Sequence, residues 1–495
     1  MKKQLPYLVL LISMLIQQRL LGQIEMSNPT AAGRAGVAST LLSDYQCVGI
    51  NPANLAHQPE FKKRNFSLGL GEFGFCLFSN ALNKLNLSDA LFDPNRKLSR
   101  SEKQQAAKDF SSKALTANLD FLYGGLSWQS DGGKFGFAVT VRERAQWYSK
   151  FSDATSELMF NGINARFVNP QTGNLEYYFN KFNVDTSNGG LSFDTTAAVR
   201  ELDALNISKI LDGSRISMSW NREYAFSCGF NVINGDLIRL NFGAGIRFIQ
   251  GIGYLDLQSK GGTYKAEIAA SPGFGIEFPT PSAKDNFGFL PNASGRGVGL
   301  EFGTTVEIGR FWTLGASITD IGAVAYNTNV YTASDGPLKA LSTKGFSNYN
   351  FFQSAEQFDG FTKEMVSWRE EKIIRSLPSR VRFGASFSSK IVNVGFDMVA
   401  PVNTISGNVL RPVASLGADV KFAGIFRLSS GIMMGGNYFN SKLPFDINPM
   451  LPVGLTIRPL GPFYEIGIAT RDILTYFRSG NPVISISTGF FRMRI

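Results

Sequence analysis

Side chains that could carry out chemistry are few in this chain of 495 residues. A hydrolase with a Ser or Thr nucleophile needs a general base, and the only imidazole is His57, with Glu60 as the one acid close to it. The sequence contains no phosphate-binding P-loop and no EF-hand-like acidic cluster. Cys47, Cys76 and Cys228 match neither a disulfide framework nor a zinc pattern, although a Cys47–Cys76 bridge remains open beside buried thiols. We therefore expect no catalytic residue, no metal ligand and no cofactor.

Charged residues recur instead at alternate positions of long apolar stretches. Over 237–254, even positions such as Phe242 and Phe248 are large and apolar, whereas Arg239 and Arg247 stand at odd positions. Successive side chains of a strand point to opposite faces, so this stretch predicts a long strand with one apolar and one polar face. The same alternation recurs in three further stretches, 134–148, 216–231 and 297–308.

The charges that this alternation places on the polar face are our candidate functional residues. They are Arg142, Arg144, Arg239, Arg247, Glu301, Glu307, Arg380, Arg382, Asp419 and Arg427. We interpret them as an ion-pair network that holds the wall of the protein together. A basic lumen that attracts an anionic solute remains the alternative.

The composition fits such two-faced strands. Gly contributes 51 and Phe 42 residues, and charged residues make up 18%, below the ~25% of ordinary soluble domains. After the N-terminus, no apolar run approaches the ~20 residues of a membrane-spanning helix. The net charge of +10 is spread along the chain, so we expect no nucleic-acid partner.

Short and long connections alternate between the predicted strands. Tight turns rich in Gly, Asn and Asp are predicted near 131–133, 234–236, 309–310, 389–390, 423–424 and 459–461. Longer connections separate them, and this rhythm is typical of outer-membrane barrels. A propeller would show a fixed repeat, and a soluble sandwich would not need strands this long. We predict an all-β, antiparallel transmembrane barrel of about 14 strands, with 12 or 16 as alternatives and long extracellular loops.

Both ends of the chain carry export features. Residues 1–22 have a basic start, Lys2 and Lys3, and an apolar core, which predicts a Sec signal peptide cleaved after Gly22. The last residues alternate large apolar side chains, as expected of a signal for barrel-insertion machinery. Its candidate residues are Gly489, Phe491, Met493 and Ile495, with a β-bulge expected beside Gly489. These features predict a protein of the cell outer membrane.

Residues 23–62 do not alternate and are rich in small side chains. They contain Gly33 and Gly36, followed by the motif Asn51, Pro52 and Ala53. This segment resembles the start of FadL-type outer-membrane transporters, the long-chain fatty-acid channel family. The resemblance implies an N-terminal plug, or hatch, inside a 14-stranded barrel that spans 63–495. A further stretch, 315–322, is similar to a strand of FadL-like barrels of secretion-associated and uncharacterised types.

Two functions follow as expectations. The first is a passive transporter for small hydrophobic or amphipathic molecules. The alternative is a non-transporting structural or adaptor barrel in an outer-membrane secretion or surface-assembly complex. Its protein partners would bind the long loops, over about 80–119, 150–214 and 327–378. In either case we expect outer-membrane lipid around the barrel, no enzymatic activity, and His57 at the plug wall. We expect interface girdles from Trp147, Tyr148, Trp220 and Tyr254.

Overall fold

The computed structural model describes most of the chain after residue 26. The described residues are 27–57, 65–79, 81–82, 86, 96–164, 167–168, 175–176, 178–179, 183–185, 192–194, 199–200, 206–271, 292–333, 335, 342–343, 345–349, 368–403, 405, 412–435, 450–477 and 483–495. The predicted signal peptide and its cleavage site lie outside them.

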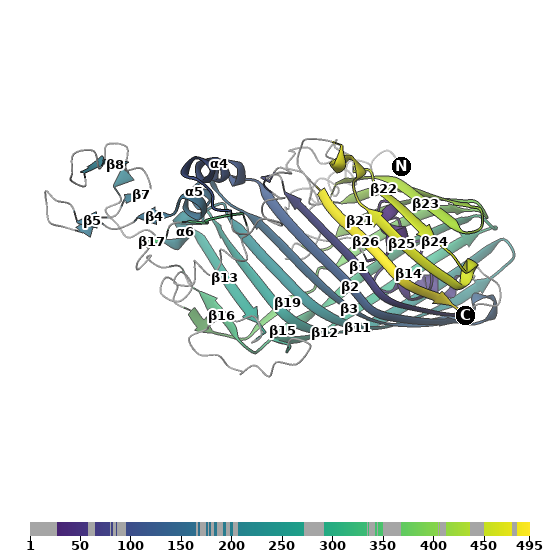
Figure 1. Ribbon diagram of the computed structural model, residues 1–495. Helices are drawn as coiled ribbons and strands as arrows, with labels where there is room; N and C mark the ends of the chain where they lie inside the picture. The colour runs from purple at the N-terminus through teal and green to yellow at the C-terminus, as the bar shows by residue number, and fades with distance from the viewer. Residues whose placement is uncertain are drawn as a thin grey trace, which may run out of the picture.

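A closed antiparallel barrel of fourteen strands dominates the described residues (Figure 1). Its strands are β1 (Phe66–Ser79), β2 (Ala114–Gln129), β3 (Phe135–Lys150), β11 (Arg215–Asn234), β12 (Ile238–Lys260), β14 (Gly295–Ile308), β15 (Trp312–Tyr326), β20 (Arg380–Ser388), β21 (Val392–Pro401), β22 (Val413–Phe422), β23 (Phe426–Gly435), β24 (Val453–Ile457), β25 (Tyr464–Thr470) and β26 (Val483–Arg494). The first and last strands pair, from Ser67 with Arg494 to Phe78 with Val483, and so close the barrel. The predicted fold class and strand count are confirmed.

The two ends of the barrel differ. Six short connections lie at one end, here called the short-turn end, at each place where the sequence predicts a tight turn. The C-terminus lies at this end (Figure 1). The opposite long-loop end carries the helices α4 (Arg100–Phe110), α5 (Asp153–Asn161) and α6 (Ile207–Ile210). The short-turn end corresponds to the periplasmic side of outer-membrane barrels.

Extra strands extend the wall at the long-loop end. The largest, β13 (Thr263–Ala270), pairs with the upper part of β12 and with β16 (Val330–Ala333). It pairs with β12 only beyond the part of β12 that pairs with β14, so it does not cross the barrel. Two further short strands belong to the same sheet, β18 (Trp368–Glu370) and β19 (Ile373–Ser376). Separate two-stranded sheets are formed by β4 (Ile163–Asn164) with β17 (Ser342–Thr343), β5 (Phe167–Val168) with β6 (Leu175–Glu176), β7 (Tyr178–Phe179) with β10 (Val199–Arg200), and β8 (Asn183–Asp185) with β9 (Ser192–Asp194).

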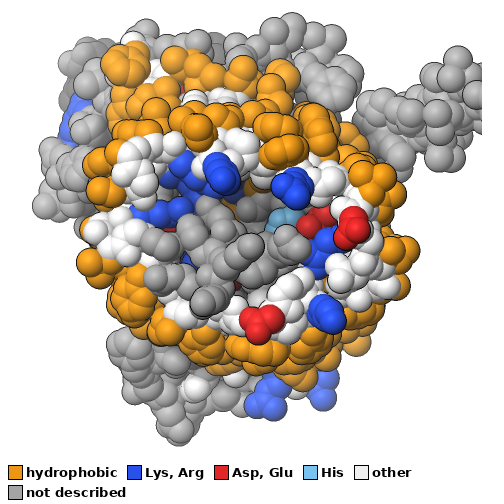
Figure 2. All heavy atoms as spheres, turned by 90° about the vertical axis from the view of Figure 1, so that its right-hand side faces the viewer, with side chains coloured by type: hydrophobic (Ala, Val, Ile, Leu, Met, Phe, Trp, Pro, Cys, Tyr) orange, Lys and Arg blue, Asp and Glu red, His pale blue; other side chains and the backbone are white. Residues whose placement is uncertain are grey.

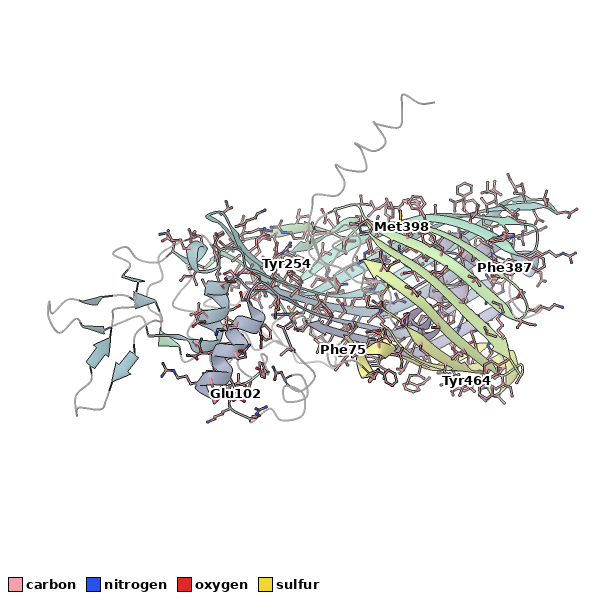
Figure 3. All side chains as sticks on the ribbon, turned by 90° about the horizontal axis from the view of Figure 1, so that it is seen from above. Phe75, Glu102, Tyr254, Phe387, Met398 and Tyr464 are labelled. Atoms are coloured by element: carbon pink, nitrogen blue, oxygen red, sulfur yellow. The ribbon has the colours of Figure 1, made fainter. Side chains whose placement is uncertain are left out.

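A belt of exposed apolar side chains surrounds the barrel (Figure 2). Neighbouring residues show the alternation directly, since Arg247 is 1% and Phe248 57% exposed. Aromatic pairs lie near the short turns, including Phe311 with Phe387 at 5.6 Å and Tyr464 with Phe491 at 5.8 Å between ring centroids. Figure 3 labels Phe387 and Tyr464 near this end. A surface this apolar is not a soluble surface, and it fits a bilayer with an aromatic girdle.

Helices α4 and α5 pack together at the long-loop end around an apolar core that includes Phe110 and Phe160. Helix α4 starts with a capping box, in which the Ser99 hydroxyl accepts from the Glu102 amide and the Glu102 carboxylate accepts from the Ser99 amide. These hydrogen bonds hold the pKa of Glu102 below its usual value. None of the described helices is long and apolar enough to cross a membrane.

The predicted girdle is partly wrong. Tyr254 is buried against Tyr326, in an apolar cluster where β13 leaves the wall. Tyr148 pairs in register with Ser217, on the inward parity of β3. Tyr254 lies where β13 extends the wall, and Tyr148 lies near the long-loop end of β3. Trp220 does face outward, where its indole donates to Glu143 at 2.5 Å.

Two charges on the outer face were not predicted. Glu143 and Arg222 are cross-strand partners on the outward parity of β3 and β11, joined at 2.9 Å. Tyr123 also donates to Glu143, at 2.8 Å. Because the carboxylate is saturated by donors, the pair is tolerated at the upper border of the apolar belt, where the cost of charge falls.

Candidate functional site

The N-terminal segment, residues 27–57, fills the lumen and is here called the plug. It consists of α2 (Pro29–Gly33) and the 3-10 helices η1 (Asp44–Cys47) and η2 (Pro52–Ala56). The side-chain Oδ1 of Asn51 accepts from the Ala53 backbone amide at 3.2 Å, with Pro52 at the first helical position. The predicted Asn51-Pro52-Ala53 motif therefore starts η2, as a capping residue followed by Pro does.

Inward-facing glycines make room for the plug. A Cβ at Gly243 would overlap the Pro52–Ala53 peptide bond, and one at Gly136 would overlap the Leu55 carbonyl. A Cβ at Gly69 would overlap the Tyr45 ring. Further wall glycines that a Cβ would push against the plug are Gly125, Gly229, Gly303, Gly384, Gly395, Gly417, Gly431 and Gly454. The high glycine content of the chain is thus partly explained, because the wall and the plug backbone approach each other closely.

Geometry also explains why Gly33 and Gly36, the two predicted plug glycines, are glycines. A Cβ at Gly33 would lie 2.8 Å from the Cα of Gly454 on β24. Gly36 has a φ of +80°, and its amide donates to the Ala31 carbonyl at 2.8 Å. This left-handed backbone conformation favours glycine. Both residues allow α2 to turn while it lies against the wall.

Wall carboxylates hold the plug by its backbone and by one arginine. Asp397 accepts from the amides of Ala38 and Ser39, both at 2.8 Å. Glu301 accepts from the Gly49 amide at 2.8 Å. Arg34 donates to Asp419 at 2.6 Å, and both side chains are fully buried. Charge-assisted bonds of this kind are the strong ones in a low-dielectric interior.

All ten candidate lumen charges point inward. Arg247 bridges Asp320 at 2.6 Å and Glu223 at 3.1 Å. Arg144 lies 3.7 Å from Glu223. The remaining members of the set are Arg142, Arg239, Glu301, Glu307, Arg380, Arg382, Asp419 and Arg427, which the structure places on the lumen side, buried. The geometry is that of an ion-pair network shared by wall and plug.

Several residues of this network were missed from the sequence. Arg34 and Asp44 stand out as charges in a segment otherwise rich in small residues. Arg492 and Arg494 alternate with the apolar residues of the last strand. They face inward because the register between β25 and β26 shifts between Gly489 and Arg492, at the place where a bulge was expected. Asp320 is missed because its φ of +61° turns it out of the strand alternation.

At the short-turn end the plug is held by its only histidine. His57 Nδ1 lies 3.1 Å from Glu307 Oε1, which also accepts from Asn241 at 2.8 Å. The side-chain Nε2 of Gln129 donates to the Leu55 carbonyl at 2.9 Å. Charged side chains gather around this opening of the barrel (Figure 2). His57 therefore takes part in anchoring the end of the plug.

We expect His57→Ala to loosen only the last turn of the plug. The side chain is 30% exposed, and ion pairs in contact with water contribute about 0–1 kcal/mol. Hydrogen exchange at the amides of 54–57 should rise by no more than about fivefold. An equal loss of protection over all of 27–57 would contradict this local role.

An apolar cluster lies on the other side of the plug, toward the long-loop end. It joins Ala35 of the plug to wall residues of β1, β22, β23 and β26. Its wall members are Cys76, Phe78, Val413, Met433, Met450 and Val483, all buried. Cys47 and Cys76 are both free thiols. The lumen is thus polar along the plug and apolar just beyond it.

The described residues show no metal site. Within the described ranges, no three His, Cys, Asp or Glu side chains are placed to hold a metal ion.

The wall is low beside the apolar cluster. Strand β24 has 5 residues, compared with 23 in β12. It pairs with β23 only from Phe426 to Ser430, and above that level Met433 forms a bridge with Met450.

Comparisons with known proteins describe the same architecture. A family model described as "Family of unknown function (DUF5723)" matches residues 61–449. No curated protein matches the chain in sequence. Similar solved structures include a TodX mutant monoaromatic hydrocarbon channel, at 11% identity and a TM-score of 0.46, covering 94% of this chain and 98% of that one.

Two further solved structures are similar over their whole length. The toluene transporter TbuX of Ralstonia pickettii has 12% identity and a TM-score of 0.41, over 96% of this chain and 99% of that one. A Pseudomonas aeruginosa FadL homologue has 11% identity and a TM-score of 0.41, over 96% and 98%. The predicted resemblance to FadL-type barrels thus recurs among solved structures. At such identities and TM-scores the likeness concerns the barrel and not the solute.

Proposed function

We propose that this chain, which belongs to the DUF5723 family of unknown function, is an outer-membrane barrel for the passive passage of small apolar molecules. Residues 27–57 are the plug that closes it. The observation that carries this proposal is the apolar cluster of Phe78, Met433 and their neighbours on the long-loop side of the plug. In an otherwise polar lumen, such a patch is suited to an apolar solute.

The cluster differs in chemistry from the rest of the lumen. Phe78, Val413 and Val483 provide a fixed apolar surface, whereas Met433 and Met450 are flexible and adapt to ligands of different shape. The cluster lies behind the low part of the wall at β24. Because the cluster is buried between the long-loop side and the plug at Ala35, a molecule that arrives from the long-loop side has to move these apolar side chains aside before it reaches the plug.

The plug is built to part from the wall. Its own apolar core joins Leu42, Tyr45, Val48, Ile50 and Leu55, and only a few wall residues enter that core. Its contacts to the wall are mainly hydrogen bonds, ion pairs and close glycine contacts. When the plug shifts, these polar groups can exchange protein partners for water, whereas an apolar interface would expose apolar surface to water without any such replacement.

Dye entry into intact Gram-negative cells that express this protein tests the proposal. The probe is N-phenylnaphthylamine, an apolar dye that fluoresces in membranes. Expression should accelerate dye entry, and Met433→Asp should remove most of that gain because burying an unpaired carboxylate is costly. Met433→Leu is the matched control and should keep the gain.

The outcome also separates passage from leakage. Entry of a small sugar, measured in parallel, should stay at the level of cells without the protein. If expression does not change dye entry, or if Met433→Asp and Met433→Leu behave alike, the transport proposal is wrong.

A structural or adaptor barrel remains the second candidate. The observation that favours it is the packed pair of helices α4 and α5 at the long-loop end, whose buried apolar core includes Phe346 and Tyr349 and which gives this end a rigid platform for a protein partner. Co-purification of a partner in fixed stoichiometry, without dye entry, would support this function. In both proposals the barrel contacts outer-membrane lipid, is inserted by the barrel-insertion machinery and catalyses no reaction.

A further inference from the structure

The plug does not contact the wall evenly, and its η1 helix lies at the place where the barrel closes. Strands β1 and β26 lie side by side there (Figure 1). They are the first and last strands of the barrel, so the ladder between them closes the barrel. We call this ladder the seam. Asp44, Tyr45 and Gln46 of η1 all reach it.

Three residues in a row bind both sides of the seam. On β1, Glu72 accepts from the Tyr45 hydroxyl at 2.5 Å and from the side-chain Nε2 of Gln46 at 2.8 Å. On β26, Arg492 donates to Asp44 at 2.6 Å and Arg494 does so at 3.4 Å. The plug therefore bridges the two strands through side chains.

The surroundings fix this bridge in place. Arg492 also pairs with Glu465 of β25 at 2.9 Å, and its guanidinium lies 5.9 Å from the Tyr45 ring centroid. The Tyr45 ring fills the space left by Gly69 on β1 and Gly125 on β2. One plug helix is thus in direct contact with β26, β1 and β2, and it is linked to β25 through Arg492.

The backbone at Asp44 shows that this contact is held under strain. Its φ is +61°, a left-handed conformation that costs energy in a residue other than glycine and persists where the surroundings hold it. Here the arginines of β26 hold the carboxylate. Glu72 of β1 and Arg492 of β26 lie at the spacing that η1 can bridge only when β1 and β26 are paired.

We propose that Asp44, Tyr45 and Gln46 form a clasp that couples plug docking to closure of the barrel between β1 and β26. The N-terminal segment is then an assembly element as well as a plug. With the clasp made, Glu72, Arg492 and Asp44 have their buried polar partners. Without the plug, Glu72 loses its two donors Tyr45 and Gln46, and Arg492 and Arg494 lose Asp44, so closure without the plug leaves charge in the lumen that is only partly compensated.

The proposal is independent of transport, because it concerns how the barrel closes and not what passes through it. It is tested by the rate of seam closure during folding of the full chain into lipid vesicles. Phe75 and Ile486 are register partners across the seam and face outward. Phe75→Cys and Ile486→Cys, with the three native cysteines replaced by Ala, let oxidation report closure.

Asp44→Asn is the decisive variant. Asn tolerates the left-handed backbone as Asp does, so the substitution removes the charge and leaves the local conformation. Loss of a hydrogen bond to a charged group predicts seam cross-linking slower by about tenfold. Arg34→Gln is the matched control, since it breaks an equally short, buried plug–wall ion pair at β22, away from the seam, and should leave cross-linking at the parent rate.

Tyr45→Phe decides the case in which Asp44→Asn does not insert at all. It removes only the hydroxyl that donates to Glu72 and should slow cross-linking by a smaller factor. Parent-like cross-linking in Asp44→Asn and Tyr45→Phe would overturn the proposal. Equal slowing by Arg34→Gln would also overturn it, since any loosening of the plug would then delay closure.

Discussion

Gly243→Val should open the barrel. A side chain at this position would overlap the Pro52–Ala53 peptide bond, so η2 has to leave its place. Val is favoured in strands, and the wall itself should therefore persist. A barrel of fourteen strands encloses a lumen too wide for inward side chains alone to fill. Ion conductance in planar bilayers should rise by about tenfold or more over the parent protein.

Gly489→Ala is the control for this result. A Cβ at Gly489 would lie 3.4 Å from Pro29, at ordinary contact distance, and conductance should stay at the parent level. If Gly243→Val forms a folded barrel that conducts no better than this control, then the plug is not what closes the lumen.

Asp419→Asn should release the N-terminal half of the plug. Arg34 is fully buried and lies 2.6 Å from Asp419, and Arg427 lies 3.6 Å from the same carboxylate. Removal of one partner from a buried ion pair costs about 3–5 kcal/mol, because the other charge remains buried. Hydrogen exchange over 29–42 should become faster by about two to three orders of magnitude.

The double variant Arg34→Gln with Asp419→Asn tests the cause. In the double variant the plug no longer buries the unpaired charge of Arg34. Hydrogen exchange over 29–42 should therefore be slower than in Asp419→Asn alone. Additive effects of the two substitutions would show that Arg34 and Asp419 act separately.

The barrel could be predicted because its rules are local. Side chains alternate along each strand, and Arg247 beside Phe248 carries the information on which face is which. Turn residues such as Asp131 and Gly132 mark the short-turn end without reference to the rest of the chain. The strand count follows from this alternation and from the six turns.

The contacts of the plug could not be predicted, because they join residues far apart in the sequence. Nothing near Asp44 indicates Arg492, and the glycines that receive Tyr45 lie on two separate strands. Small irregularities also hide inward charges, such as the positive φ of Asp320 and the register shift before Arg492. On the outer face, Glu143 and Arg222 break the alternation, and these charges are tolerated there because they form an ion pair with each other.

The account rests on an apolar ligand that binds beside the plug, and native mass spectrometry of the detergent-extracted protein tests this most directly. Bound small molecules and protein partners are read from the same spectrum. We expect the parent protein and Met433→Leu to retain an apolar small molecule that Met433→Asp has lost. A spectrum with a protein partner in fixed stoichiometry and no small molecule, unchanged in Met433→Asp, would contradict the transport account.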